Sequence, residues 1–214
     1  MQVYPRTIAA SGTHEIVVKK SRFICTLTRA VSEDAARGVI DGVRRRHWDA
    51  SHHCSAYRVG PGGQFQRTSD DGEPAGTAGA PMLAVLTRRD LTDTVAVVTR
   101  YFGGVLLGAG GLIRAYGQAV AEATDVVGIV ECRPLVLVTV EADHGDAGRL
   151  EHALRAAGFA LGPVAYATRV AFEVRLDESE RPAFEDWLAD ATNGRGRARV
   201  TGQLQVEVPV AKGA

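Results

Sequence analysis

The sequence predicts an α+β protein of two domains. Its 214 residues suit two small domains better than one large core. Strand-like and helix-like patterns alternate along the chain, and the composition changes near residues 131–134, which is typical of a boundary. We therefore expect a first domain over residues 1–131 and a second domain over residues 132–214.

The first domain is expected to open with two strands and a helix. Residues 14–20 and 22–30 are rich in the β-branched and aromatic residues of strands. Residues 32–47 carry apolar side chains at helical spacing and end in a basic cluster, which complements the helix dipole. Ser32 is the expected N-cap of this helix.

The strand expected over residues 93–102 is central to the first domain. It is nearly continuous in apolar residues, as strands covered on both faces are. A helix over residues 80–89 precedes it, with Thr77 as a candidate cap and Pro81 in the first turn, where proline is tolerated. The remaining expected elements are strands over 52–60 and 64–69 and a long helix over 108–128.

The second domain is expected to be ferredoxin-like. Its elements read strand, helix, strand, strand, helix, strand, which is the βαββαβ order of that fold. No polar motif is concentrated in this half, so the sequence assigns no chemistry to it. The expected elements span residues 135–142, 146–158, 162–168, 169–177, 178–193 and 198–210.

The charge balance excludes a protein that binds nucleic acid non-specifically through a high overall positive charge. The formal net charge is zero, whereas chains that act by neutralising phosphates are strongly basic. Any contact with nucleic acid must then come from a local patch. Basic residues do gather along the first domain, at Lys19, Lys20, Arg22, Arg44, Arg45, Arg46, Arg88 and Arg89.

The chain is expected to be cytoplasmic and to have no membrane span. Three cysteines that lack a C-x-x-C spacing indicate a reducing compartment, and the chain opens without a signal-peptide pattern. The apolar run over residues 95–113 has nearly the length of a spanning helix. Arg100 and five glycines inside this run indicate instead a strand, a turn and a helix start.

The stretch "TSDDGEPAGTAGAP" gathers three carboxylates, Asp70, Asp71 and Glu73, in a polar loop that also holds Thr77. Carboxylates this close could hold a hard cation, or could divide their pKa values and act as an acid–base pair. The alternative is a hairpin-type turn at Asp71, in which Asp70 and Ser69 cap backbone amides.

A glycine-rich turn between a strand and a helix forms the second candidate site. Such a turn brings backbone N–H groups together at the positive end of the helix dipole and favours an anion or RNA phosphate. Arg100 and Arg114 could add direct phosphate contacts. The pattern is neither a Walker A loop nor a dinucleotide fingerprint, and close packing of helix on sheet is the alternative. The glycines concerned are Gly103, Gly104, Gly108, Gly110 and Gly111.

His52, His53 and Cys54 form the third candidate site. On a strand, His52 and Cys54 share one face, but zinc needs three or four ligands and no others stand at a recognised spacing. Cys54 as a nucleophile would lack a base, because His53 points to the opposite face. Hydrogen-bonded histidines beside a buried thiol fit better, and we expect neither a metal nor a cofactor.

Four motifs together resemble the YigZ/IMPACT family: "KKSRFI", "DASHHCSAY", "SDDGEPAGTAGAPML" and "VTRYFGGVLLGAGGLIRAYGQAV". The resemblance implies that the first domain is similar to the second domain of the small-subunit ribosomal protein S-five and to the GHMP kinases. It implies that the second domain is similar to the fifth domain of elongation factor G. It also implies a link to the control of translation, because eukaryotic members act in the pathway that senses amino-acid starvation. Ala80 departs from the family pattern, which has lysine at this position, and so weakens any mechanism that needs that lysine.

The expected function is a non-catalytic, translation-associated binding role in which the first domain contacts RNA, the ribosome or a translation factor. The alternative is an enzyme that binds a phosphorylated small molecule or nucleotide with Mg²⁺ at the glycine-rich loop. Arg100 is costly to bury without a partner. We expect it to pair with Asp70 or Asp71, which would join the polar loop and the glycine-rich turn in one site.

Overall fold

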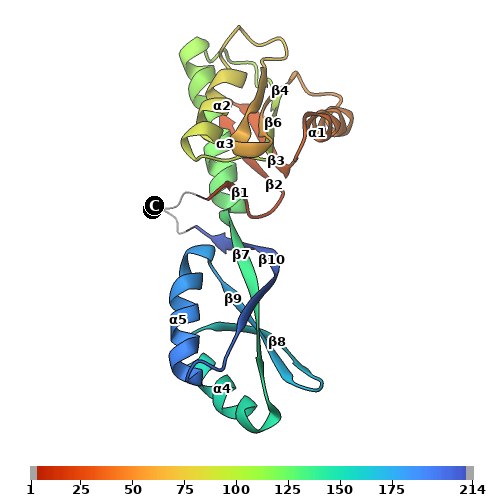
Figure 1. Cartoon of the computed structure of the whole chain (residues 1–214). Coiled ribbons are helices and arrows are strands. Elements are labelled where there is room, and N and C mark those ends of the chain that lie inside the picture. The colour runs from red at the N-terminus through yellow and green to blue at the C-terminus, as the bar shows by residue number, and fades with distance from the viewer. Residues whose placement is uncertain (1–3, 211–214) are drawn as a thin grey trace. The chain divides into compact units, whose positions relative to one another are not determined.

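The chain folds into two compact units in the computed structural model, which describes residues 4–210 (Figure 1). Among the described residues, the first unit holds 4–132 together with 207–210, and the second unit is Arg133–Val206. Helices and mainly antiparallel strands occur in both units, which confirms the predicted α+β class.

The first unit is built on a sheet of five strands. These are β2 Gly12–Val18, β3 Ser21–Arg29, β4 His52–Val59, β5 Phe65–Ser69 and β6 Thr94–Tyr101, with a 3₁₀ turn, η1 Pro61–Gly63, between β4 and β5. The strand order is β2-β3-β6-β4-β5, and each neighbouring pair is antiparallel. β6 therefore lies at the centre, as its apolar sequence predicts.

Helices cover both faces of this sheet. They are α1 Glu33–Arg46, α2 Gly79–Arg88 and α3 Ala109–Val127. Alternate side chains of β6 enter two different cores: Val95 and Val97 pack on the side of α1, and Ala96 and Val98 pack on the side of α2 and α3. Figure 1 shows α2 and α3 on one side of the strands and α1 on the other. Ser32 caps α1 as predicted, with its side chain accepting a backbone N–H.

The second unit contains the predicted order of strands and helices. Its elements are the greater part of β7 Ile129–Ala142, then α4 His144–Ala156, β8 Ala160–Tyr166, β9 Val170–Leu176, η2 Glu178–Glu180, α5 Arg181–Thr192 and the greater part of β10 Ala198–Pro209. β9 lies between β7 and β8 in antiparallel pairing, and β10 pairs with β7. Val138 of β7 and Phe172 of β9 share one core with Leu154 of α4 and Phe184 of α5.

β7 is longer than predicted and runs through the stretch read as a boundary. The strand expected over residues 135–142 begins at Ile129 and includes Pro134. Its first three residues pair with β1 (Arg6–Ile8), whereas its pairing with β9 starts at Val136. Pro134 lies between these two ladders, where its missing N–H costs no hydrogen bond. β1 was not predicted, because three residues carry too little pattern.

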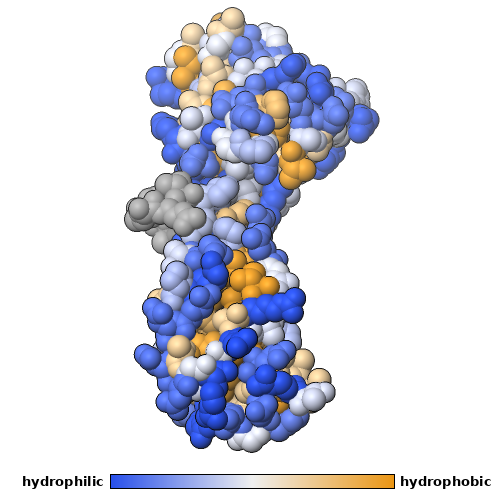
Figure 2. Space-filling view, viewed as in Figure 1, coloured by the Kyte–Doolittle hydropathy of each residue, from blue (hydrophilic) through white to orange (hydrophobic). Residues whose placement is uncertain are grey.

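Within residues 4–210, no helix is both long and apolar enough to cross a lipid bilayer. The apolar run over residues 95–113 is divided, as predicted, between β6, an irregular turn and the start of α3. The three cysteines are free thiols, of which Cys25 and Cys54 are buried. Figure 2 shows that the visible face of each unit is mainly hydrophilic, with separate hydrophobic patches.

Candidate functional site

The sequence motifs meet at one edge of the first sheet. At this edge β6 ends and β3 and β4 begin, and the antiparallel register places Arg100 beside Phe23 of β3 and His52 of β4. The loop over residues 70–78 reaches the same edge, since the carbonyl oxygen of Asp71 accepts a hydrogen bond from His52 Nδ1 at 2.8 Å.

Arg100 and Glu73 form a buried ion pair at the centre of this site. Arg100 Nη1 lies 2.6 Å from Glu73 Oε1, and only 6% and 3% of the two side chains are exposed. Tyr116 of α3 donates its hydroxyl to the same carboxylate oxygen at 2.7 Å. The pair joins the polar loop to the end of β6. The prediction that Arg100 pairs with Asp70 or Asp71 was wrong. Its partner is Glu73, because Asp70 and Asp71 accept hydrogen bonds from other donors.

The Arg100 guanidinium is enclosed by protein groups rather than open to a phosphate. Its Nη2 lies 3.3 Å from Ser21 Oγ. The rings of Phe23 and Phe102 lie with their centres 5.3 and 5.5 Å from its Cζ, close enough for cation–π attraction. The side chain therefore has a structural role, which corrects the expectation of a direct anion contact.

Asp70 organises the start of α2. Its carboxylate accepts backbone N–H groups of Gly76 at 2.8 Å, Ala78 at 3.0 Å and Gly79 at 2.8 Å. Burial alone would raise the pKa of Asp70, but the three donors together hold that pKa below its ordinary value. The prediction of Thr77 as the helix cap was wrong, because its hydroxyl donates at 2.6 Å to a carbonyl within the loop.

Asp71 ties α1 to β4. Its Oδ2 accepts the backbone N–H of His53 at 2.6 Å, and its Oδ1 accepts a hydrogen bond from Arg44 Nη2 at 2.7 Å. The backbone is left-handed here, with φ of 43° at Asp71 and 87° at Gly72, as in a tight turn. Like the other two carboxylates of the loop, Asp71 is satisfied by protein donors. Within residues 4–210, no group of three His, Cys, Asp or Glu side chains is placed to hold a metal ion.

Cys54 and His53 are held by structural hydrogen bonds. Cys54 Sγ lies 3.0 Å from the carbonyl oxygen of Asp70 and 3.3 Å from the hydroxyl of Tyr116. Burial raises the pKa of the Cys54 thiol to about 12, so the thiol is protonated at neutral pH. His53 Nε2 donates to the carbonyl oxygen of His47 at 2.9 Å. His53 is therefore not placed to activate Cys54.

Gly103 allows two of the motifs to approach closely. A Cβ at this position would lie 2.1 Å from the backbone carbonyl of Lys20, and the N–H of Gly103 donates to Ser21 Oγ at 3.1 Å. The β2–β3 hairpin and the glycine-rich segment thus pack backbone against backbone. The hydrogen-bond network does not extend to the other residues predicted in that segment, Gly104, Gly108, Gly110, Gly111 and Arg114, and Arg114 is exposed on α3.

Cationic side chains surround this network and form what we call the basic edge: Lys19, Lys20, Arg22, Arg44, Arg45 and Arg46. Specific contacts hold three of them at this edge. Lys20 lies against Gly103, and Arg44 reaches the polar loop. The Arg22 guanidinium lies 5.3 Å from the ring centre of Tyr101. The basic cluster at Arg88 and Arg89 belongs to the other end of α2, where Arg89 pairs with Asp125.

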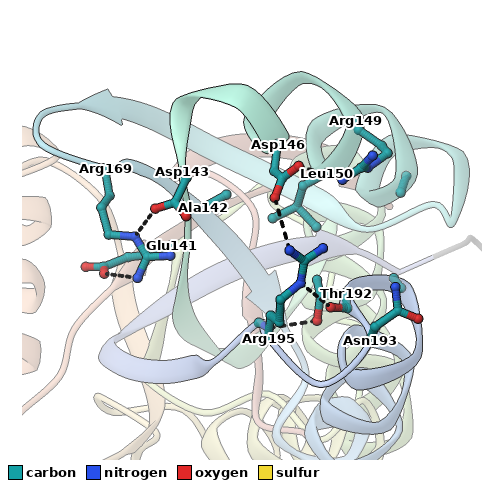
Figure 3. A pocket seen from close by; sticks show the side chains of 13 residues that line it. Glu141, Ala142, Asp143, Asp146, Arg149, Leu150, Arg169, Thr192, Asn193 and Arg195 are labelled. Atoms are coloured by element: carbon teal, nitrogen blue, oxygen red, sulfur yellow. Dashed lines mark hydrogen bonds and ion pairs between the residues drawn. The ribbon is translucent and has the colours of Figure 1, made fainter.

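A second polar hollow lies within the second unit (Figure 3). It measures about 220 Å³ and is lined by the first turns of α4 and the end of α5. Arg169 Nε lies 3.1 Å from Asp143 Oδ1, and Arg195 Nη1 lies 3.9 Å from Asp146 Oδ2. Sequence reasoning missed this hollow because its lining is scattered over residues 141–196. Its charged side chains are exposed and pair with one another, so the geometry assigns it no ligand.

Known proteins are similar in sequence to most of this chain. The family model described as the Impact N-terminal domain matches residues 19–124, and the model described as a domain of unknown function matches residues 140–195. The IMPACT family member YvyE of Bacillus subtilis is 48% identical over 189 residues, which are 88% of this chain and 87% of YvyE. The IMPACT family member YigZ of Escherichia coli is 38% identical over 179 residues, which are 83% of this chain and 88% of YigZ.

A solved structure, described as that of a hypothetical protein, is also similar. It is 35% identical, covers 94% of this chain and 99% of its own, and has a TM-score of 0.59. The match to the Impact N-terminal domain begins at Lys19, in the turn against which Gly103 packs, and ends at Thr124 on α3. It thus contains the whole network around Arg100. The resemblance carried by the four sequence motifs is confirmed, and this chain belongs to the IMPACT family.

Proposed function

We propose that this protein is a non-catalytic, translation-associated protein that contacts RNA through the basic edge of its first unit. The observation that carries the proposal is the convergence of these cationic side chains at one end of a sheet, in a chain of zero net charge. Lys and Arg side chains contact and neutralise the phosphates of nucleic acids. The basic edge is the local patch that a neutral chain needs for binding RNA.

Four cations of the basic edge are free to take phosphates. Lys19, Lys20, Arg45 and Arg46 are exposed, and within residues 4–210 none of them forms an ion pair. Arg44 differs, because it is already bound to the polar loop. An unpaired exposed cation keeps all its N–H donors available, so these four side chains can meet an anionic backbone without breaking a contact of the fold.

The turn between β2 and β3 adds support. Lys19 and Lys20 have φ values of 46° and 67°, a left-handed conformation that costs a residue other than glycine about 1–2 kcal/mol. Hairpin turns of this kind usually carry asparagine or glycine. A fold that keeps two lysines in such a turn is typical of a segment under functional constraint, and here the strain presents two ammonium groups at the tip of a hairpin.

Two fold resemblances support the translation context by analogy. The first unit is proposed to resemble the second domain of the ribosomal protein S-five. The second unit, with its βαββαβ order, is proposed to be ferredoxin-like and to resemble the fifth domain of elongation factor G. Both counterparts belong to the translation machinery, so ribosomal RNA is the expected partner.

An enzymatic role at the polar loop has less support. It would require Asp70, Asp71 or Glu73 to hold Mg²⁺ or to take a proton. Asp70 instead holds the start of α2, Asp71 holds a backbone N–H of β4, and Glu73 neutralises a buried guanidinium. Releasing any of the three would disrupt the loop itself, so the geometry favours binding over catalysis.

Sedimentation through a ribosome-separating gradient tests the proposal. Tagged protein is expected to move with ribosomal particles at low salt and to be released as salt rises, because screened charges lose their attraction. Replacing Arg45 and Arg46 together by glutamate should abolish the co-sedimentation. The matched control replaces Arg197 and Arg199 by glutamate, which changes the charge equally in the second unit and should leave the co-sedimentation intact.

Crosslinking to RNA in the same fractions completes the test. Protein that remains in the soluble fractions at low salt and crosslinks to no RNA would contradict the proposal. Co-sedimentation without RNA crosslinks would indicate a ribosomal protein or a translation factor as the partner, and would equally contradict the RNA contact.

A further inference from the structure

We infer that the basic edge takes single-stranded RNA in preference to duplex RNA, with a base stacked on the exposed ring of Trp48. The inference rests on the proposed function, because it names the form of RNA that the same surface would accept. It comes from a set of aromatic side chains that lie among the cations of the basic edge.

Trp48 presents its ring to solvent. It follows His47 in the loop between α1 and β4, and 82% of it is exposed. Tryptophan side chains are highly buried on average. The other tryptophan of the chain, Trp187, follows that pattern, with its ring centre 4.9 Å from Phe159 and 6.0 Å from Phe184. No packing requirement of the first unit therefore explains the position of Trp48.

Further rings and a planar guanidinium lie close to His47, the residue before Trp48. The ring centre of His47 lies 6.2 Å from that of Tyr101, whose other neighbour is the guanidinium of Arg22 at 5.3 Å. The next residue, Phe102, is 49% exposed. Tyr101 is fixed in place by hydrogen bonds of its hydroxyl with His47 and Asp49, both at 3.1 Å.

The neighbours of this aromatic set favour RNA over an apolar protein surface. Trp48 comes two residues after the three arginines that end α1, Arg44–Arg46, with His47 between them. Buried aromatic anchors of protein interfaces lie in a hydrophobic, desolvated centre, whereas here the ring is exposed to solvent just after a basic helix end. Alternation of rings and cations matches a polymer that alternates bases and phosphates.

The expected preference for single-stranded RNA follows from the faces of the bases, which are free to stack only in a single strand. In an A-form duplex the bases are stacked on one another and the major groove is too narrow for side chains. In a single strand the base faces are free, and stacking on an aromatic side chain contributes about 1–3 kcal/mol per base. A duplex could satisfy the lysines and arginines but would leave the face of Trp48 without a partner.

Intrinsic fluorescence of the full chain tests the inference, because the chain has two tryptophans. Trp187→Phe leaves Trp48 as the only tryptophan, and Trp48→Phe leaves Trp187. Titration with a 12-nucleotide oligouridylate is expected to quench the fluorescence of the Trp187→Phe protein and to leave that of the Trp48→Phe protein unchanged. An RNA duplex of the same length should bind more weakly and quench little.

Affinity measured by anisotropy of a labelled oligouridylate gives the second readout. Trp48→Ala should weaken binding by about 5- to 150-fold, the equivalent of one lost base stack. The matched control is Tyr166→Ala in the second unit, which removes a ring that is 71% exposed and should leave the affinity unchanged. Both rings are exposed, so neither variant should alter the melting temperature.

Three outcomes would overturn the inference. If duplex and single strand bind equally and Trp48→Ala binds as the wild type does, the stacking role fails while RNA binding stands. If no RNA binds, the proposed function fails and the inference fails with it. If RNA leaves Trp48 fluorescence unchanged but Trp48→Ala prevents capture of a protein partner, the ring serves a protein interface instead.

Discussion

At Arg100, a guanidinium is buried among a carboxylate, a hydroxyl and two aromatic rings. The need for a carboxylate partner follows from the sequence, because an unpaired charge at the end of a central strand costs several kcal/mol. The choice of carboxylate does not follow from it. Asp70, Asp71 and Glu73 lie within four positions, and the direction of each side chain depends on a left-handed turn that only the folded loop reveals.

Glu73→Gln should destabilise the protein strongly. The amide would leave the Arg100 guanidinium buried without its counter-charge, and breaking a buried pair on one side costs about 3–5 kcal/mol. Urea unfolding followed by circular dichroism measures the change. The double variant Glu73→Gln/Arg100→Met, which removes the charge as well, should recover part of the loss.

The control for this prediction is an exposed pair. Glu15 and Arg22 lie 2.7 Å apart at the surface, where solvent screens the attraction. Glu15→Gln should therefore leave the urea midpoint almost unchanged. Equal midpoints for Glu73→Gln and Glu15→Gln would refute the structural role assigned to the buried pair.

Cys54 should be unreactive in the folded protein at pH 8. Burial raises the pKa of its thiol to about 12, so below that pH the nucleophilic thiolate is scarce. The pKa of Cys25 is raised by burial as well. Titration with Ellman's reagent is expected to modify Cys132, which is partly exposed, before the other two thiols, and to modify all three in denaturant.

A Cys132→Ser variant isolates the buried thiols. The folded variant should then show no rapid reaction between pH 7 and 8. A thiol that reacts within seconds under these conditions would show that Cys54 is activated, and would revive the nucleophile role that His53 is not placed to support.

At the scale of elements, the N-terminal cap of helix α2 could not be predicted from the local sequence pattern. The apolar face of this helix and the tolerated Pro81 could be predicted from the sequence, but its cap could not. Thr77 stands at a favourable distance from the helix start, yet the N–H groups there are taken by Asp70, which lies nine positions before Gly79. A cap supplied by a folded-back loop leaves no spacing rule in the sequence.

Gly103→Ala should destabilise the contact between two elements, the β2–β3 hairpin and the segment before α3. The added methyl group would lie 2.1 Å from a backbone carbonyl, which cannot rotate away as a side chain can, and overpacking of this kind costs about 1–3 kcal/mol. Gly38→Ala on α1, where a Cβ meets nothing within 4 Å, should instead stabilise by about 0.5–1 kcal/mol. Thermal unfolding that ranks the two variants the other way would contradict the packing described.

For the whole molecule, the order of strands and helices in both halves could be predicted, because long periodic segments such as β6 and α3 carry their pattern locally. β1 and the first residues of β7 could not, since their pairing joins residues more than 120 positions apart. The meeting of the motifs at one edge is likewise a property of the sheet order. Lys19 lies in the turn between β2 and β3, whereas Arg45 and Trp48 lie at and just after the end of α1, and the antiparallel register brings these two segments to the same edge.

The salt dependence of binding to a single-stranded oligoribonucleotide tests the central claim most directly, namely that the basic edge contacts RNA phosphates. Each neutralised phosphate contributes about −0.7 to the slope of log affinity against log salt concentration for a single strand. Contacts from the four free cations predict a slope of about −3. Replacing Lys19 and Lys20 by alanine should reduce its magnitude by about 1.4, and replacing Arg197 and Arg199 should leave it unchanged. A wild-type slope near zero, or equal losses in the two double variants, would contradict the account.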